Sequence, residues 1–220
     1  VAGIDRLAAR ERLGIPADAR LVVIFGGSQA VRRLNDAVAA ALPTLVERRF
    51  VIHVAGPDGI DAALAARAPL PEAVRDQYRP AAFLGEELLD ALAAADLIVG
   101  RAGSSTLAEA TAFGLPMVVV PYPHAGAHQR ANALVLADAG AAELIADEAF
   151  DAAALLAAAA ILDDPGRHAA MAAAARAMGR PGAADAVAEI LLALADRRPL
   201  PDPAALTRLA SGAPSTAGAA

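Results

Sequence analysis

The chain has 220 residues and a net charge of −6, with 19 arginines and neither lysine nor cysteine. The lack of cysteine excludes disulfides, thiolate catalysis and cysteine-based metal sites. The acidic balance and the scattered arginines argue against nucleic-acid binding. The longest apolar run, 152–162, is shorter than the roughly 20 residues of a membrane-spanning helix.

Apolar periodicity predicts alternating helices and strands through the first half of the chain. The pattern gives helix 4–13, strand 21–25, a Gly-rich loop, helix 31–46, strand 50–55, helix 60–67, a short helix after Pro71 and strand 81–84.

The second half continues the alternation and then becomes helical. The pattern gives helix 88–94, strand 97–99, helix 106–113, strand 117–121, helix 128–139, strand 142–145, and helices 151–162, 166–178 and 183–195. Residues 197–220 show no periodicity and are expected to form a flexible tail. The start at Val1, inside a predicted helix, indicates a piece of a longer protein.

Regular alternation of this kind predicts an α/β fold with a doubly wound parallel sheet, Rossmann-like, followed by extra C-terminal helices. In such a sheet the loops that follow the strands gather at one edge, where ligands bind. Candidate site residues are therefore sought just after each predicted strand.

The stretch Gly100–Glu109 follows one strand and leads into a helix. Gly103 permits a tight turn, and Ser104, Ser105 and Thr106 offer N-caps and free amides that favour an anion. Thr106 and Glu109 also have the spacing of a capping box, so Glu109 either caps the helix or binds ligand hydroxyls, as acidic residues do at ribose. Arg101 is either a site cation or a surface ion-pair partner, with the surface role slightly favoured.

A second candidate loop, Gly26-Gly27-Ser28-Gln29-Ala30, follows the first strand and precedes a long helix. It is either a plain tight turn or a phosphate cradle. It lacks the G-x-G-x-x-G pattern, which disfavours a nicotinamide-dependent oxidoreductase.

Different roles are expected for the four histidines. His53, inside a strand, is expected to be a hydrogen-bonded structural residue, and His168 to be exposed. His128, Gln129 and Asn132 share one turn of a helix and are expected to form a comb of polar groups for sugar hydroxyls. No third ligand with suitable spacing accompanies His124 and His128, so a zinc site is not expected.

In order and spacing, these segments resemble the C-terminal, donor-binding half of the MurG family, the UDP-N-acetylglucosamine transferases of peptidoglycan synthesis. The similarity runs from Leu21 to about Leu194. It is carried by Gly26-Gly27-Ser28-Gln29 with Leu34-Asn35, His53 with Gly56, Phe83-Leu84, Ala95-Asp96-Leu97, Arg101–Glu109, Gly114-Leu115-Pro116, Val120–His124, and His128-Gln129 with Asn132-Ala133.

The resemblance implies one half of a GT-B glycosyltransferase, with a UDP-sugar domain at 1–196 and a tail at 197–220. It implies that Gly27, Ser28 and the helix start Ser104-Ser105-Thr106 hold the diphosphate, and that Arg101 and Gly103 are further donor-binding residues. Leu84 would meet uracil through its backbone, Glu109 would bind the ribose, and His128 and Gln129 would contact the N-acetylglucosamine. Ala30 and Ala125-Gly126-Ala127 depart from the family pattern.

The resemblance further implies no catalytic residue in this chain, no metal and no cofactor. The acceptor, a lipid-linked muramoyl pentapeptide, and the general base would belong to an absent N-terminal domain, so this chain alone is expected to be inactive. The full-length protein would be cytoplasmic and peripheral on the inner face of the cell membrane. The alternatives are another UDP-sugar enzyme, such as a glycolipid transferase or epimerase, and a non-catalytic subunit that needs a partner chain.

Overall fold

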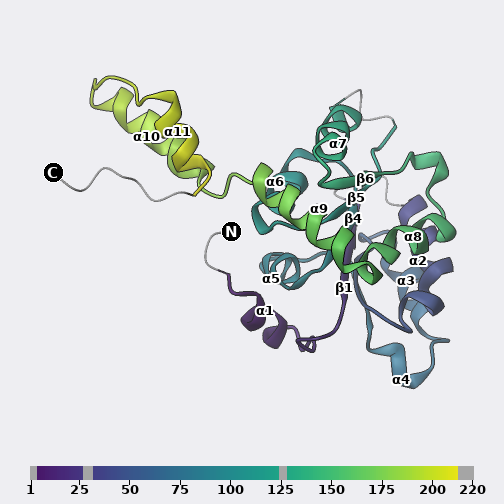
Figure 1. Ribbon diagram of the computed structural model, residues 1–220. Helices are drawn as coiled ribbons and strands as arrows, with labels where there is room; N and C mark the ends of the chain where they lie inside the picture. Colours follow the sequence, from purple (N-terminus) through teal and green to yellow (C-terminus); the bar gives the residue numbers. More distant parts are fainter. Residues whose placement is uncertain (1–3, 27–31, 124–127, 213–220) are drawn as a thin grey trace.

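The computed structural model describes residues 4–26, 32–123 and 128–212 (Figure 1). In this part of the chain, six parallel strands form one sheet in the order β3-β2-β1-β4-β5-β6. The expected doubly wound parallel sheet is therefore confirmed. The strands are β1 (Leu21–Phe25), β2 (Phe50–Val54), β3 (Tyr78–Ala81), β4 (Leu97–Gly100), β5 (Met117–Val119) and β6 (Ala142–Leu144).

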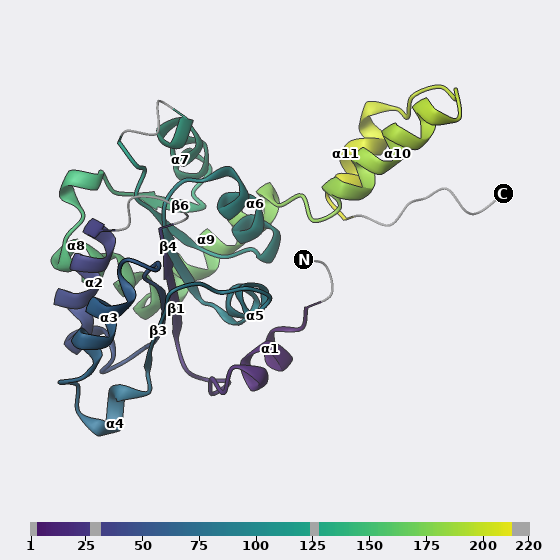
Figure 2. The same cartoon turned by 180° about the vertical axis from the view of Figure 1, so that it is seen from behind.

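Helices cover both faces of the sheet (Figures 1 and 2). One face carries α2 (Arg32–Leu45), α3 (Ile60–Arg67) and α8 (Ala152–Ala159). The other carries α1 (Arg6–Arg12), α5 (Glu87–Ala94), α6 (Ser104–Phe113) and α7 (His128–Asp138), and α9 (Pro165–Met178) contributes to both. Short elements complete the fold: α4 (Glu72–Arg75), η1 (Asp147–Ala149) and η2 (Ala160–Asp163).

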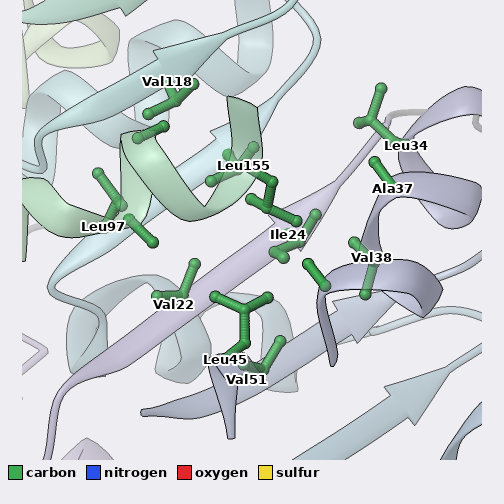
Figure 3. Packing of buried hydrophobic residues seen from close by; sticks show 14 of the residues in the cluster. Val22, Ile24, Leu34, Ala37, Val38, Leu45, Val51, Leu97, Val118 and Leu155 are labelled. Atoms are coloured by element: carbon green, nitrogen blue, oxygen red, sulfur yellow. The ribbon is translucent and has the colours of Figure 1, made fainter. Parts of the chain in front are cut away.

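The continuous apolar run of β1 is explained by burial on both faces. Val22 and Ile24 pack among the side chains of α2 and α8 (Figure 3), whereas Leu21, Val23 and Phe25 point into the opposite cluster. Successive side chains of a strand alternate between faces, so a strand with helices on both sides needs apolar residues at every position.

The topology creates a switch point between β1 and β4. From β1 the chain winds outward through β2 and β3, and from β4 it winds the other way through β5 and β6. The helices that follow β1 and β4, which are α2 and α6, therefore lie on opposite faces of the sheet. A crevice outside the carboxyl ends of the strands at this point is the usual ligand site of such folds.

The strand expected at 81–84 is wrong, because β3 lies earlier, at Tyr78–Ala81. Its sequence contains Arg79 and Pro80 and so lacks the apolar run of a central strand. The structure explains this composition, since β3 is an outermost strand of the sheet and an edge strand tolerates proline. Leu84 consequently lies in the loop after the strand.

The helix α10 (Ala183–Ala195) is confirmed, and the described part of the segment after it, in which no periodicity was found, includes a helix. This helix is α11 (Pro203–Ala210), which begins at an N-cap, Asp202, whose carboxylate accepts a hydrogen bond from the amide of Ala205. α10 and α11 pack side by side and extend away from the sheet (Figures 1 and 2).

Asp96 anchors the opposite, amino-terminal edge of the sheet. Its carboxylate receives hydrogen bonds from Arg6 and Arg10, each at 2.7 Å, and from the amide of Leu21 at 2.8 Å. Arg10 is buried with it, and α1 is thereby fixed to the start of β4. Among the described helices, none is long and apolar enough to cross a membrane.

Candidate functional site

Pairing of β1 with β4 brings together the points at which two of the predicted ligand loops begin. Phe25 and Gly100, the last residues of the two strands, are partners in the parallel ladder. A β-carbon at Gly100 would lie 2.4 Å from the carbonyl oxygen of Phe25, so only glycine allows this approach. The chain therefore leaves the sheet at Gly26 and at Arg101 from neighbouring points.

The start of α6 has amide groups without helical partners. Gly103 is its N-cap, with φ −67° and ψ 138°, and glycine supplies no side-chain cap. The first helical hydrogen bond is donated by the amide of Leu107 to the carbonyl of Gly103, at 3.0 Å. The amides of Ser104, Ser105 and Thr106 consequently have no partner within the helix, and together with the helix dipole they favour an anion.

This geometry rules out the capping-box interpretation of Glu109. The helix begins at Ser104 rather than at Thr106, so Thr106 is the third helical residue and Glu109 lies in the second turn. Among the described residues the half-buried carboxylate of Glu109 has no hydrogen-bond or ion-pair partner. Glu109 and the amides of Ser104, Ser105 and Thr106 belong to the same helix. A ligand that binds these amides could therefore also contact the carboxylate of Glu109.

Arg101 is not the surface ion-pair partner that was favoured. Its side chain is buried, with 5% exposed, and its Nη1 donates to the carboxylate of Asp147 at 2.5 Å and to the carbonyl of Val120 at 3.0 Å. Its guanidinium lies 5.4 Å from the ring centre of Tyr122. These contacts connect the Arg101 side chain to η1 and to the segment that follows β5.

The expected polar comb on α7 is only partly present. Gln129 accepts a hydrogen bond from the amide of Tyr122 at 2.9 Å, and the amide nitrogen of Asn132 donates to the carbonyl of Ala102 at 3.2 Å. Both side chains thus hold the loops after β4 and β5. His128, the first residue of α7, is exposed.

His53 is a structural residue, as predicted. Asn35 donates through Nδ2 to the carbonyl of Ala55 at 2.9 Å, so its Oδ1 accepts from Nε2 of His53 at 3.0 Å. Nδ1 of His53 then accepts from the hydroxyl of Tyr78 at 2.7 Å. Burial lowers the pKa of His53 to about 4, so the ring is neutral near pH 7.

The prediction that His168 is exposed is wrong. His168 is half-buried, and its Nε2 lies 2.9 Å from the carbonyl oxygen of Asp96, so Nε2 donates the hydrogen bond. His168 and Asp96 line a cavity of about 300 Å³ at the amino-terminal edge of the sheet. This edge is opposite to the one that carries the free amides of α6.

Only some of the remaining predicted residues lie in the part of the chain that the structure describes. Leu84 is half-buried in the loop after the carboxyl end of β3, at the same edge as the start of α6. Gly27, Ser28 and His124 lie outside the described residues. The part of the chain that the structure describes holds no cluster of three or more residues able to ligate a metal ion.

Sequence reasoning missed Asp147, which lies at the beginning of η1 just beyond β6. Its carboxylate contacts Arg101 from the loop after β4 and Arg33 from the first turn of α2. Asp147 also lines a cavity of about 330 Å³ together with Tyr122, Arg130 and Glu148. The available signal was its position: an acidic residue shortly after a strand of a parallel sheet.

Comparison with known proteins agrees with this architecture. Residues 21–188 match the glycosyltransferase family 28 C-terminal domain. A UDP-N-acetylglucosamine–N-acetylmuramyl-(pentapeptide) pyrophosphoryl-undecaprenol N-acetylglucosamine transferase from Desulforudis audaxviator (strain MP104C) is 40% identical over 204 residues, or 87% of this chain and 53% of that protein.

Solved structures show the same relationship. The crystal structure of Acinetobacter baumannii MurG superimposes with a TM-score of 0.70 and 30% identity, covering 87% of this chain and 53% of that one. A protein from Listeria monocytogenes described as a UDP-N-acetylglucosamine 2-epimerase gives a TM-score of 0.66 at 18% identity, over 88% of this chain and 49% of that one, and shows the shared fold alone.

The chain thus spans about half the length of the relatives that it matches. The resemblance to the MurG family and the fold of one half of a GT-B transferase are both confirmed. By the match over most of its length, the chain belongs to the glycosyltransferase family 28 C-terminal domain family.

Proposed function

We propose that this chain binds UDP-N-acetylglucosamine at the carboxyl edge of its sheet. The observation that supports the proposal is the pairing of Phe25 with Gly100, since the chain leaves β1 at Gly26 close to the point where Arg101 leads toward the start of α6. A diphosphate held there would accept hydrogen bonds from the amides of Ser104, Ser105 and Thr106. The named relatives, which transfer N-acetylglucosamine, support this choice of donor.

The other contacts follow from the same placement. Glu109 lies one turn further along α6, where its carboxylate would accept hydrogen bonds from the ribose hydroxyls. The loop at Leu84 would bind uracil through its backbone, and Gly27 and Ser28 would complete the diphosphate site. His128 is exposed at the start of α7 and would contact the sugar, with Gln129 supporting its loop.

The reaction that this site would serve is an inverting transfer to a lipid-linked muramoyl pentapeptide in peptidoglycan synthesis. The acceptor's C4 hydroxyl would displace UDP at the anomeric carbon, with a general base that takes its proton. The helix start at Ser104 would stabilise the negative charge that develops on the departing diphosphate. We assign the acceptor and the base to the part of the relatives that this chain does not span.

The location of the full-length protein follows from its acceptor. A lipid-linked acceptor and a nucleotide-sugar donor meet at the cytoplasmic face of the cell membrane. We therefore place the full-length protein there, as a peripheral membrane protein.

Calorimetry on the chain tests the donor site directly. We expect UDP-N-acetylglucosamine to bind, and Glu109→Ala to weaken binding about tenfold or more, because a charge-assisted hydrogen bond contributes about 1.5–3 kcal/mol. Glu72→Ala, on exposed α4 before β3, is the matched control and should leave the affinity unchanged. An unaltered affinity in Glu109→Ala would remove Glu109 from the site.

A panel of donors tests the identity of the sugar. We expect UDP-N-acetylglucosamine to bind more tightly than UDP-glucose or UDP-galactose. A preference for either of the latter would favour a different UDP-sugar enzyme, which the shared fold of the Listeria protein allows.

A further inference from the structure

One acidic residue joins segments that are far apart in the sequence but adjacent at the carboxyl edge. The carboxylate of Asp147 lies 2.5 Å from Nη1 of Arg101 through one oxygen and 3.2 Å from Nε of Arg33 through the other. Arg33 belongs to the first turn of α2, and Arg101 begins the loop that leads into α6. Asp147 therefore connects the helices that follow both predicted phosphate loops.

The connection extends to the third predicted segment. Arg101 also donates to the carbonyl of Val120, and its guanidinium lies over the ring of Tyr122. The amide of Tyr122 is in turn bonded to Gln129 on α7. Through Arg101, the carboxylate of Asp147 thus fixes the loop after β5 as well.

Burial makes this arrangement sensitive to change. The side chain of Arg101 is 5% exposed and that of Asp147 is 14% exposed, whereas Arg33 is 50% exposed. Charged groups with so little access to water depend on well-placed partners, and the loss of one partner shifts the other. Replacement of Asp147 would therefore disturb the buried Arg101 and release Arg33.

We propose that Asp147 is a positioning residue that sets the start of α2 relative to the start of α6, at the edge of the sheet where the donor is proposed to bind. The proposal rests on the proposed function of this edge as a donor site. Asp147 acts through Arg33 and Arg101 and makes no contact of its own with the diphosphate.

The direction in which one substitution changes the binding affinity distinguishes a positioning role from a purely electrostatic effect. Removal of a carboxylate near a diphosphate makes the site more positive, so electrostatics alone would strengthen binding. Loss of positioning would weaken it. Asp147→Asn changes the charge with almost no change in shape, and the two explanations predict opposite results.

The experiment is calorimetry with UDP-N-acetylglucosamine on the parent chain, Asp147→Asn and Glu148→Gln. Glu148 is the matched control, because it is the adjacent acidic residue, is exposed and has no ion pair among the described residues. We expect Asp147→Asn to weaken binding about five- to thirtyfold, as for one or two net hydrogen bonds. Glu148→Gln should bind like the parent or slightly more tightly.

A double-mutant cycle shows whether Asp147 acts through Arg33. Arg33→Ala should weaken binding, and its combination with Asp147→Asn should lose less affinity than the two single losses added together. Thermal melting checks each variant for folding. Should Asp147→Asn not fold, the half-exposed Arg33→Ala decides the question by itself, and parental affinity in that variant overturns the proposal.

Failure of the proposed function and failure of the proposed role of Asp147 give different results. Failure of the parent chain to bind UDP-N-acetylglucosamine would overturn the proposed function. Binding by the parent, with equal affinities for Asp147→Asn and Glu148→Gln, would overturn the role of Asp147 and leave the donor site standing. Additive losses in the cycle would overturn the coupling through Arg33.

Discussion

The backbone of Gly100 lies against the carbonyl oxygen of Phe25, at a separation that would leave a β-carbon only 2.4 Å from that oxygen. The two residues are partners in the ladder between β1 and β4, at the point where both strands end. Since the loops of the proposed donor site begin one residue later, this contact sets the distance between their first residues, Gly26 and Arg101.

Gly100→Ala is expected to push β1 and β4 apart at this edge. We expect a loss of about 1–3 kcal/mol in the free energy of unfolding, as for other overpacked sites. The affinity for UDP-N-acetylglucosamine should also fall. Urea denaturation and calorimetry measure the two effects.

Gly85→Ala is the control, since a β-carbon there would meet nothing within 4 Å. It should retain the parental stability. A Gly100→Ala protein that is as stable as Gly85→Ala would contradict the steric argument.

A second prediction compares two ion pairs that differ in burial. Asp96→Ala removes the partner of the buried Arg10 and should cost about 3–5 kcal/mol in unfolding free energy, because a buried cation then lacks its carboxylate. Asp90→Ala removes the partner of the half-exposed Arg12 and should cost far less. Equal losses, measured by urea denaturation, would refute the role of burial.

A third prediction concerns pH. Burial lowers the pKa of His53 to about 4 from 6.5, so the unfolded state takes up a proton at a higher pH than the folded state. The contribution of His53 to stability is therefore complete above pH 6.5 and decreases as the pH falls toward 4, by about 3 kcal/mol in total.

The test is the difference in unfolding free energy between the parent and His53→Gln, measured from pH 7 to pH 4. This difference should shrink or change sign as the pH falls, because the variant lacks the titrating group. His168→Gln, which keeps His53, controls for the general effect of replacing a histidine with glutamine. A constant difference between the parent and His53→Gln would contradict the assignment.

A fourth prediction addresses the loop after β3. If uracil is bound by the backbone at Leu84, Leu84→Ala should leave the affinity for UDP within about twofold of the parent, because the backbone groups are retained. Leu84→Pro removes the amide N–H and should weaken binding strongly. Calorimetry with UDP measures both, and a large loss in Leu84→Ala alone would assign the contact to the side chain.

Much of the fold could be predicted from local patterns. The continuous apolar run of β1 is typical of a strand that is buried on both faces, and regular alternation of strands with helices indicated the parallel sheet. Gly114 correctly marked the end of α6, where it adopts a left-handed conformation with φ 66°. These signals lie within a few residues of the structure that they determine.

Other features of the fold could not be predicted from local sequence patterns. The edge position of β3 depends on which strands lie beside it, so its polar sequence gave no clear pattern. Ser104, Ser105 and Thr106 all suit an N-cap, and only the folded turn showed that Gly103 holds that position. α11 was missed because its short apolar pattern follows a region rich in proline.

The sequence by itself therefore determined the class of fold and the family, because strand burial and motif spacing are local properties. Only the tertiary structure decided what the charged residues do. Arg101 meets Asp147 across 46 positions, and His168 meets the carbonyl of Asp96 across 72. Such pairings are set by the packing of strands and helices and leave no periodic signal in the sequence.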